Sequence, residues 1–355
     1  MTLPRADFWR GRRVLLTGHT GFKGSWASLW LERLGAEVAG FALAPDQTPN
    51  LFSQLAPFAR ASSTVGDLAD FDTLATLARD FRPQIVLHMA AQPLVRRSYR
   101  TPRETFATNV QGTANVLDAV RGLDGVEAVL AVTTDKVYAI DGADRPFLES
   151  DRLGGHDPYS ASKAAAEIVV ASYAASFFDP AAIPLASARA GNVVGGGDWS
   201  EDRLIPDIWR ALHAGRTLEL RYPQATRPWQ HVLEPVAGYL LLLEALVDRP
   251  SATPRALNFG PAPGAAEISV AEVAEAFGRG LGHDRPWAPA PGEHPHETNA
   301  LALDAGAAIG ALGWQPRLDA AQTLQWTADW YRGYDAGEDA RALTLAQIEA
   351  YEDLT

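Results

Sequence analysis

Short apolar runs alternate with amphipathic segments along the first half of the chain. The runs are mostly uncharged, as expected of strands buried on both faces of a parallel sheet, and they lie at residues 14–17, 38–43, 65–67, 85–90, 128–133 and 185–190. Between them, apolar residues recur with a helical period at 25–34, 71–82, 105–120 and 159–178. This alternation predicts βαβ units, and therefore an α/β fold with a doubly wound parallel sheet.

The pattern changes after residue 190. The run Gly195–Gly197 and the prolines at 206, 223, 228 and 235 interrupt the alternation, which resumes with a helix at 235–247 and a strand at 256–260. We therefore expect a first lobe of residues 1–190, to which residues 232–262 return. A smaller α+β lobe is expected from 191–231 and 263–330, and a helical extension from 331–355.

Composition and charge exclude several classes of protein. The 355 residues include 31 basic and 43 acidic side chains, a net charge of −12 without a basic block, which argues against a nucleic-acid surface. No cysteine is present, so disulfides, thiolate metal sites and cysteine nucleophiles are excluded. The first residues lack an apolar signal core, and the longest apolar stretch, 235–243, is much shorter than the roughly 20 residues of a membrane span. We expect a cytoplasmic protein without a membrane partner.

A glycine-rich segment, residues 18–24, directly follows the first predicted strand and precedes the first helix. Glycines at this place permit a tight turn and close approach to a pyrophosphate, while the start of the helix supplies free N–H donors. A purely structural turn is the alternative, but the position favours a dinucleotide site in a Rossmann-type lobe. The residues expected to contact the cofactor here are Gly18, Thr20, Gly21, Phe22, Lys23 and Gly24.

The ends of the second and third strands bear on the choice of cofactor. The acidic residue that usually binds the adenosine ribose is missing after the second strand, where Asp46 lies too far along. No arginine follows that strand to pair with a 2′-phosphate, so NAD is expected rather than NADP. Asp67 and Leu68 are placed to meet the adenine, with a helix-capping role as the alternative for the aspartate.

The sharpest candidate chemistry is in Tyr159 and Lys163, which are four residues apart and so share one face of a helix. An ammonium group close to a phenol lowers the pKa of the phenol from about 10 and makes it a usable base. Tyr159 could then take the proton of a substrate hydroxyl, and Thr134, at the end of the fifth strand, can bind that same hydroxyl. Next to it, Asp135 and Lys136 could supply a proton donor and a base for a second carbon, or could be only an ion pair at the strand end.

The chain resembles the extended short-chain dehydrogenase/reductase family over nearly its whole length. The motifs that carry the resemblance are residues 18–26, 88–93, 134–136, 157–163, 189–199, 227–232, 258–261 and 294–297. Within the family, the resemblance is to nucleotide-sugar 4,6-dehydratases. Relatives acting on dTDP-glucose carry Asp-Glu where this chain has Asp135-Lys136, so Lys136 implies CDP-glucose as substrate.

The resemblance also implies further contacts and an assembly. Additional cofactor contacts are expected at Ala90, Ala91 and Gln92, and substrate contacts at Asn192, Arg203, Leu204, Arg227 and His296. No metal is expected, because redox-neutral dehydration needs none. Apolar residues around much of the helices at 105–120 and 159–178 suggest a four-helix bundle between subunits, hence a homodimer or a dimer of dimers.

The implied reaction begins when Tyr159, helped by Lys163 and Thr134, takes the proton of the glucose 4-hydroxyl as NAD oxidises C4. Asp135 then protonates the departing 6-hydroxyl, and hydride returns to C6. Lys136 either removes the C5 proton or only stabilises the enolate. A 4-epimerase, a dehydratase of another nucleotide sugar, and a non-catalytic dinucleotide sensor remain as alternatives.

Overall fold

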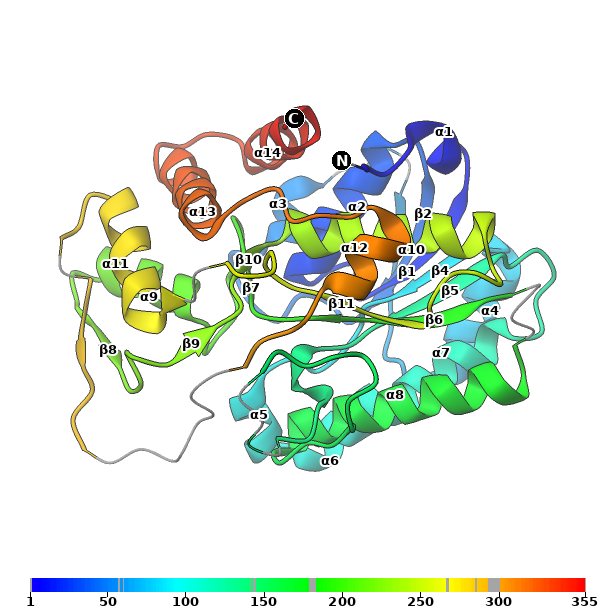
Figure 1. Cartoon of the computed structure of the whole chain (residues 1–355). Helices are drawn as coiled ribbons and strands as arrows, with labels where there is room; N and C mark the ends of the chain where they lie inside the picture. The colour runs from blue at the N-terminus through cyan, green and yellow to red at the C-terminus, as the bar shows by residue number, and fades with distance from the viewer. Residues whose placement is uncertain are drawn as a thin grey trace.

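A seven-stranded parallel sheet forms the centre of the molecule, as Figure 1 shows. The computed structural model describes residues 2–56, 58–59, 61–140, 142, 145–178, 183–265, 268–284, 286–292 and 301–354. The strands, in their order across the sheet, are β11 (Ala256–Phe259), β6 (Leu185–Ala190), β5 (Ala128–Val132), β4 (Ile85–His88), β1 (Arg13–Thr17), β2 (Glu37–Ala42) and β3 (Ala61–Val65). The predicted doubly wound α/β fold is confirmed.

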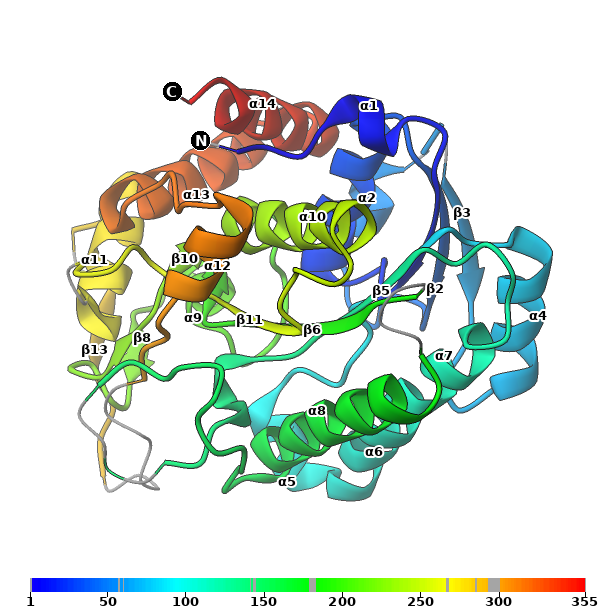
Figure 2. The ribbon, with the colours of Figure 1, turned by 45° about the vertical axis from the view of Figure 1, so that its right-hand side comes forward.

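Helices cover both faces of this sheet (Figures 1 and 2). One face packs against α2 (Phe22–Arg33) and α10 (Leu233–Asp248), and the other against α4 (Phe71–Phe81), α7 (Gly112–Val120) and α8 (Pro158–Ser176). Successive residues of β1 serve opposite faces, because Val14 and Leu16 belong to the first core and Leu15 to the second. Both cores are needed because the central strands carry apolar side chains on both of their faces.

Three predicted boundaries were wrong. The third strand spans Ala61–Val65 rather than 65–67, since this edge strand carries exposed serines and gives no apolar signal. The helix expected at 105–120 begins at Pro102, whose ring suits a first helical position, and consists of α6 (Pro102–Phe106), a π-helical turn (Ala107–Gln111) and α7. Helix α2 begins at Phe22, three residues before the expected start, directly at the glycine-rich segment.

A smaller group of elements lies at one end of the sheet (Figure 1). It contains α9 (Leu204–His213), α11 (Val270–Gly280) and two short strand pairs, β8 (Leu218–Leu220) with β13 (Trp287–Pro289) and β9 (Thr226–Arg227) with β12 (Ile268–Ser269). A third pair, β7 (Val193–Val194) and β10 (Gln230–His231), joins this group to the strands of the main sheet. The chain therefore leaves the sheet after β6 and returns to it at β11, as expected.

Of the C-terminal helices, α13 (Ala320–Asp335) packs against α11, and α14 (Ala340–Asp353) folds back against α2 in the first part of the chain (Figure 2). The completely buried carboxylate of Glu234 in α10 accepts hydrogen bonds from the backbone N–H groups of Arg317 and Leu318, each at 2.8 Å, and from the Tyr351 hydroxyl at 2.7 Å. These bonds attach the segment that precedes α13, and also α14, to the main core. In the part of the chain that is described, no helix combines the length and the apolar character of a membrane span.

Candidate active site

The glycine-rich segment forms a cradle between the ends of β1 and β4. Gly18 has a φ of +78°, and a Cβ there would lie 2.6 Å from the backbone nitrogen of Ala90. A Cβ on Gly24 would lie 2.1 Å from the Gly18 carbonyl oxygen, so neither position has room for a side chain. Helix α2 starts at this cradle, and its N-cap, Gly21, makes no side-chain capping bond. The tight loop and the uncapped N–H groups fit the pyrophosphate of a dinucleotide.

Lys23 lies in the first turn of α2 and belongs to the same charged neighbourhood as the catalytic candidates. Burial, together with the positive charges of Arg203 and Lys163, lowers the pKa of its ammonium group to about 7. The carboxylates of Asp135 and Asp198 act in the opposite direction. Two lysines and an arginine from three separate segments therefore lie close enough for their charges to interact, and such a concentration of positive charge suits a ligand that carries negative charge.

Two other cofactor candidates form hydrogen bonds with backbone groups. The Thr20 hydroxyl donates to the Leu43 carbonyl at 2.9 Å, and the Asp67 carboxylate accepts from the Ala69 N–H at 2.9 Å. Leu68 is buried, whereas Asp67 is exposed at the end of β3. The helix-capping role considered as its alternative was wrong, because Asp70 is the N-cap of α4, and Asp67 stabilises the turn before that helix. Its contact with an adenine stays a prediction.

The segment after β4 connects the cradle to the catalytic helix. Gln92 is buried, and its backbone N–H donates to the Asn109 side chain at 2.8 Å. Asn109 donates in turn to the Ser162 hydroxyl at 2.8 Å, and Ser162 donates to the Tyr159 carbonyl at 2.7 Å. Residues 90–92 are therefore fixed relative to α8. Asn109 was not predicted from the sequence. It lies in the π-helical turn Ala107–Gln111, and such turns are frequent at functional sites.

After β5, the chain makes a single 3-10 turn, Asp135–Val137, whose N-cap is Thr134. The Asp135 carboxylate is completely buried, and its Oδ1 accepts from the Thr134 hydroxyl at 2.8 Å and from the Lys136 ammonium at 3.1 Å. The Oδ2 of the same carboxylate is buried without a hydrogen-bond partner. Lys136 also donates to the Asn192 side chain at 3.3 Å, which brings the acid–base pair next to a predicted substrate residue. A buried carboxyl oxygen without a partner is available to a reacting group.

Tyr159 and Lys163 face this turn from the start of α8, where Asp157 caps the helix and Pro158 occupies its first position. Burial raises the pKa of the Tyr159 phenol to about 12, although a hydrogen bond with Thr134 and the charge of Arg203 both lower it. The expected lowering of this pKa was therefore wrong, because burial outweighs the nearby donors and cations. Lys163 donates to the Val132 carbonyl at 3.0 Å, and burial lowers its pKa to about 8.

The predicted substrate residues follow β6 and border the second lobe. Arg203 is the N-cap of α9, lies 3.4 Å from the Asp198 carboxylate, and is close enough to Tyr159 to influence its pKa. Leu204 begins α9, and Arg227 lies in β9, where its guanidinium donates to the Thr226 carbonyl at 2.7 Å. His296 and the neighbouring His294 lie outside the described residues. The structure thus brings Asn192 to the catalytic turn and Arg203 near Tyr159, and leaves the role of Arg227 as a prediction.

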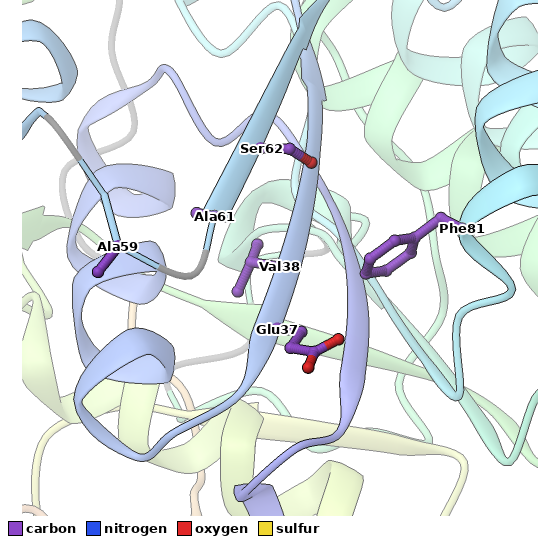
Figure 3. A pocket seen from close by; sticks show the side chains of 6 residues that line it. All are labelled: Glu37, Val38, Ala59, Ala61, Ser62 and Phe81. Carbon is purple, nitrogen blue, oxygen red and sulfur yellow. The ribbon is translucent and has the colours of Figure 1, made fainter.

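Two further features of the described chain bear on the type of site. No group of three or more histidine, aspartate or glutamate side chains that could hold a metal ion occurs among the described residues. A hollow of about 660 Å³ between β2, β3 and the end of α4 is lined by the residues labelled in Figure 3: Glu37, Val38, Ala59, Ala61, Ser62 and Phe81. It lies at the amino ends of its strands, whereas ligands of parallel sheets bind at the carboxyl ends, where the cradle and Thr134 lie.

Comparisons with known proteins agree with this geometry. The NAD dependent epimerase/dehydratase family model matches residues 14–260. The chain is 42% identical over 354 residues to the CDP-glucose 4,6-dehydratase of Salmonella typhimurium, covering 98% of each chain. It is 29% identical over 338 residues to the dTDP-glucose 4,6-dehydratase of Xanthomonas campestris pv. campestris, covering 89% of this chain and 92% of the relative.

The fold is similar to that of the epimerase Mth375 from Methanothermobacter thermautotrophicus. The TM-score is 0.82 at 22% sequence identity, and the match covers 93% of this chain and 95% of the other. The family model covers both the cradle and the catalytic turn, and the relative in Salmonella typhimurium aligns across the second lobe as well. This chain therefore belongs to the NAD dependent epimerase/dehydratase family.

Proposed function

We propose that this chain is a CDP-glucose 4,6-dehydratase, a hydro-lyase that converts CDP-D-glucose into CDP-4-keto-6-deoxy-D-glucose and water. The observation that carries the proposal is the ion pair of the buried Asp135 and the partly buried Lys136 next to Thr134 and Tyr159. An oxidation at C4 needs only Tyr159, Lys163 and Thr134. The additional pair of Asp135 and Lys136 is required only if water is also eliminated from C5 and C6, because that step needs both an acid and a base. The similarity to the CDP-glucose 4,6-dehydratase of Salmonella typhimurium over 98% of both chains favours the same substrate.

NAD is the proposed cofactor, and the cradle at Gly18–Gly24 with the start of α2 would hold its pyrophosphate. When bound, NAD supplies a hydride acceptor and donor, and the positive charge of its nicotinamide favours a phenolate nearby. Residues 90–92 and Lys163 would border it, while Asp67 and Leu68 would lie towards its adenine. No arginine directly follows β2 in the sequence, and Arg97, which pairs with Asp46 beyond β2 at 3.1 Å, also pairs with Glu104 at 3.2 Å, which favours NAD over NADP.

The first step is the oxidation of C4. Tyr159 accepts the proton of the 4-hydroxyl, and Thr134 holds the same hydroxyl in place. The charged form of Lys163 stabilises the phenolate form of Tyr159 that this step requires. Because the pKa of Lys163 is about 8, this lysine is mainly charged at neutral pH and loses its charge as the pH rises above 8.

The second step eliminates water from C5 and C6. The 4-ketone acidifies the C5 hydrogen, so that a base can remove it, and Asp135 donates a proton to the departing 6-hydroxyl. Its Oδ2 is the free oxygen for that donation, because Oδ1 is already bound by Thr134 and Lys136. Lys136 is the proposed base at C5, or the cation that stabilises the enolate. After hydride has returned to C6, C5 takes back one proton.

The protons balance over the complete cycle. Tyr159 gains one proton from the 4-hydroxyl, and Asp135 loses one proton to the water that leaves. Any proton that is removed from C5 is returned to C5. One proton must therefore pass from Tyr159 to the region of Asp135, through solvent, before the next turnover.

The second lobe is proposed to bind the CDP moiety. Asn192, Arg203 and Leu204 lie at the entrance to this lobe, and Arg227 and His296 are the remaining candidates. Guanidinium groups suit a diphosphate because they form charge-assisted, bidentate hydrogen bonds. The division into a dinucleotide lobe (1–190 with 232–262), a substrate lobe (191–231 and 263–330) and a helical extension (331–355) is retained as part of the proposal.

A homodimer or a dimer of dimers is also proposed. Two large apolar side chains on the outer surface of α8 and directly after it are exposed: Ile168 by 61% and Phe177 by 52%. Phe106, at the end of α6, is exposed by 38%. Helices α6, α7 and α8 pack side by side, so a second copy could cover this surface by forming a four-helix bundle.

The function is tested by incubating the protein with CDP-glucose and NAD and measuring the alkaline absorbance of a 4-keto-6-deoxy sugar. The expected product is lighter than the substrate by one water and carries a keto group. A 4-epimerase would instead yield an isomer of unchanged mass without a keto product. Turnover of dTDP-glucose or UDP-glucose in preference to CDP-glucose would contradict the proposed substrate, and absence of turnover with all three would contradict the activity.

A further inference from the structure

A buried ion pair lies beneath the catalytic turn and is not part of the reaction described above. Glu167, on α8, and Arg189, on β6, are each 4% exposed. Arg189 binds the carboxylate through two hydrogen bonds, from Nε at 2.9 Å and from a terminal guanidinium nitrogen at 2.8 Å. The Ser187 hydroxyl adds a third, at 2.7 Å. Two buried charges of this kind are retained only where their mutual bonds offset the cost of removing them from water.

The pair reaches both ends of the turn that carries Thr134, Asp135 and Lys136. Before the turn, the Thr133 hydroxyl donates to the Glu167 carboxylate at 2.5 Å. After the turn, Arg189 donates to the Tyr138 hydroxyl at 2.8 Å. The Tyr138 hydroxyl itself donates to the Asn258 side chain, on β11, at 2.7 Å. The residues immediately before and after the catalytic turn are thus bound to one rigid unit.

Glu167 also lies on the same face of α8 as the two catalytic candidates of this helix. Tyr159, Lys163 and Glu167 follow one another at intervals of four residues and so lie along one face of α8. Successive turns of the helix meet successive residues of the strand end: Lys163 binds the Val132 carbonyl, and Glu167 binds the Thr133 hydroxyl. The helix that carries the phenol and the turn that carries the acid are therefore fastened to each other at this face.

We propose that Glu167 and Arg189 are a pair of positioning residues, which clamp the catalytic turn at Thr133 and Tyr138 and hold it in register with Tyr159 and Lys163. Neither side chain touches a reacting atom. The pair acts through the residues it binds, so its loss displaces Thr134 and Asp135 relative to Tyr159. Displacements of about 1 Å in an active site can cost on the order of 100-fold in rate.

The charge of Glu167 adds a second consequence, at Lys163. Burial lowers the pKa of Lys163 to about 8, and the Glu167 carboxylate raises it. Two further titratable groups interact with this lysine: His88 on β4, whose pKa is lowered to about 3 mainly by burial so that it is neutral, and Lys23 on α2. Removing the carboxylate therefore lowers the pKa of Lys163 further, and the charged form is lost at a lower pH.

The clamp is tested with Thr133→Val and Tyr138→Phe, which each remove one hydroxyl and leave both charges in place. The matched controls are Thr327→Val and Tyr351→Phe, which remove buried hydroxyls in the C-terminal helices, away from the turn. With CDP-glucose, each clamp variant should lower kcat by roughly tenfold or more, while KM stays within about twofold of the wild type. The controls should leave kcat unchanged, even where they lower Tm by the same amount.

The charge is tested with Glu167→Gln, whose rate should decline at a lower pH on the alkaline side than the wild-type rate. Glu167→Asp, which keeps the charge, should restore the wild-type position of this decline. A double variant, Glu167→Gln with Arg189→Met, avoids leaving a buried arginine without its partner if the single variant does not fold. An alkaline decline at the wild-type pH in every folded variant without the carboxylate would overturn the effect on Lys163.

The inference rests on the proposed function only for its kinetic measurements. Crystal structures of Thr133→Val and Tyr138→Phe test it without turnover, because the turn at 134–137 should be displaced from α8 in both. Wild-type protein that does not convert CDP-glucose would refute the proposed function alone. An undisplaced turn, or a kcat equal to that of the controls, would refute the clamp alone.

Discussion

Replacing Asp135 by asparagine should separate the two chemical steps of the proposed reaction. Asparagine has the shape of aspartate, and its side-chain oxygen can still accept from Thr134 and Lys136 as Oδ1 does now, at 2.8 and 3.1 Å. Its amide group then takes the place of Oδ2, which is buried without a partner and is the proposed proton donor. An amide cannot protonate a leaving hydroxyl. General acid catalysis contributes about 100- to 10,000-fold, so the barrier to elimination should rise by about 3 to 5 kcal/mol.

A single-turnover experiment with excess enzyme and CDP-glucose can follow both steps. The absorbance of the reduced dinucleotide reports the oxidation at C4, and the alkaline absorbance of the product reports completed elimination. In Asp135→Asn, the reduced dinucleotide should form at nearly the wild-type rate and then persist. Tyr159→Phe is the control for the first step and should form none. If Asp135→Asn neither accumulated reduced dinucleotide nor slowed product formation, aspartate would not be the acid.

Three other properties of the chain can be measured directly. Arg227→Ala should raise the apparent Kd for CDP-glucose much more than it changes the rate of the chemical step, and an unchanged Kd would exclude this arginine from the diphosphate site. Burial raises the pKa of Glu234 to about 7, above its usual 4.5, so folding is favoured at low pH and this contribution is lost as the pH rises through 7. Glu234→Gln should therefore raise the free energy of unfolding at pH 9 by up to about 3 kcal/mol and change it little at pH 5, as measured by urea denaturation at both pH values. Light scattering at micromolar concentration should give at least a dimer, and replacing both Ile168 and Phe177 by glutamate should yield monomers; a monomeric wild type would contradict the proposed assembly.

The sequence was sufficient for features that depend on neighbouring residues. The buried strands are continuous apolar runs, and the Tyr159–Lys163 spacing places both side chains on one helical face wherever that helix lies. The glycine-rich segment follows the first strand, and a steric reason accounts for it: side chains at Gly18 and Gly24 would collide with the backbone. Each of these inferences concerns a few consecutive residues and needs no knowledge of the tertiary structure.

Contacts between distant residues could not be predicted in this way. Lys136 meets Asn192 across 56 positions, and Arg189 meets Tyr138 across 51. The pKa of Tyr159 was misjudged for the same reason, since helical spacing indicates the neighbouring lysine but not the extent of burial that outweighs it. Glu167 could have been found, because it continues the four-residue spacing of Tyr159 and Lys163, although its partner on β6 could not.

The ion pair between Asp135 and Lys136 explains how one turn could supply both an acid and a base. As an ion pair, the carboxylate has no proton to donate, and the ammonium cannot accept one. The transfer of a single proton along their 3.1 Å hydrogen bond changes both groups at once, into a carboxylic acid and a neutral amine. If the amine then takes the C5 proton while the acid protonates the 6-hydroxyl, elimination restores the ion pair. Within the low-dielectric surroundings of the buried carboxylate, that recovered attraction favours elimination over its reversal. In the elimination step, Lys136 thus becomes a base by giving its proton to its neighbour, and the proton that C5 later takes back is replaced by the one that Tyr159 gained. This is a physical reason to find the two residues adjacent in the sequence.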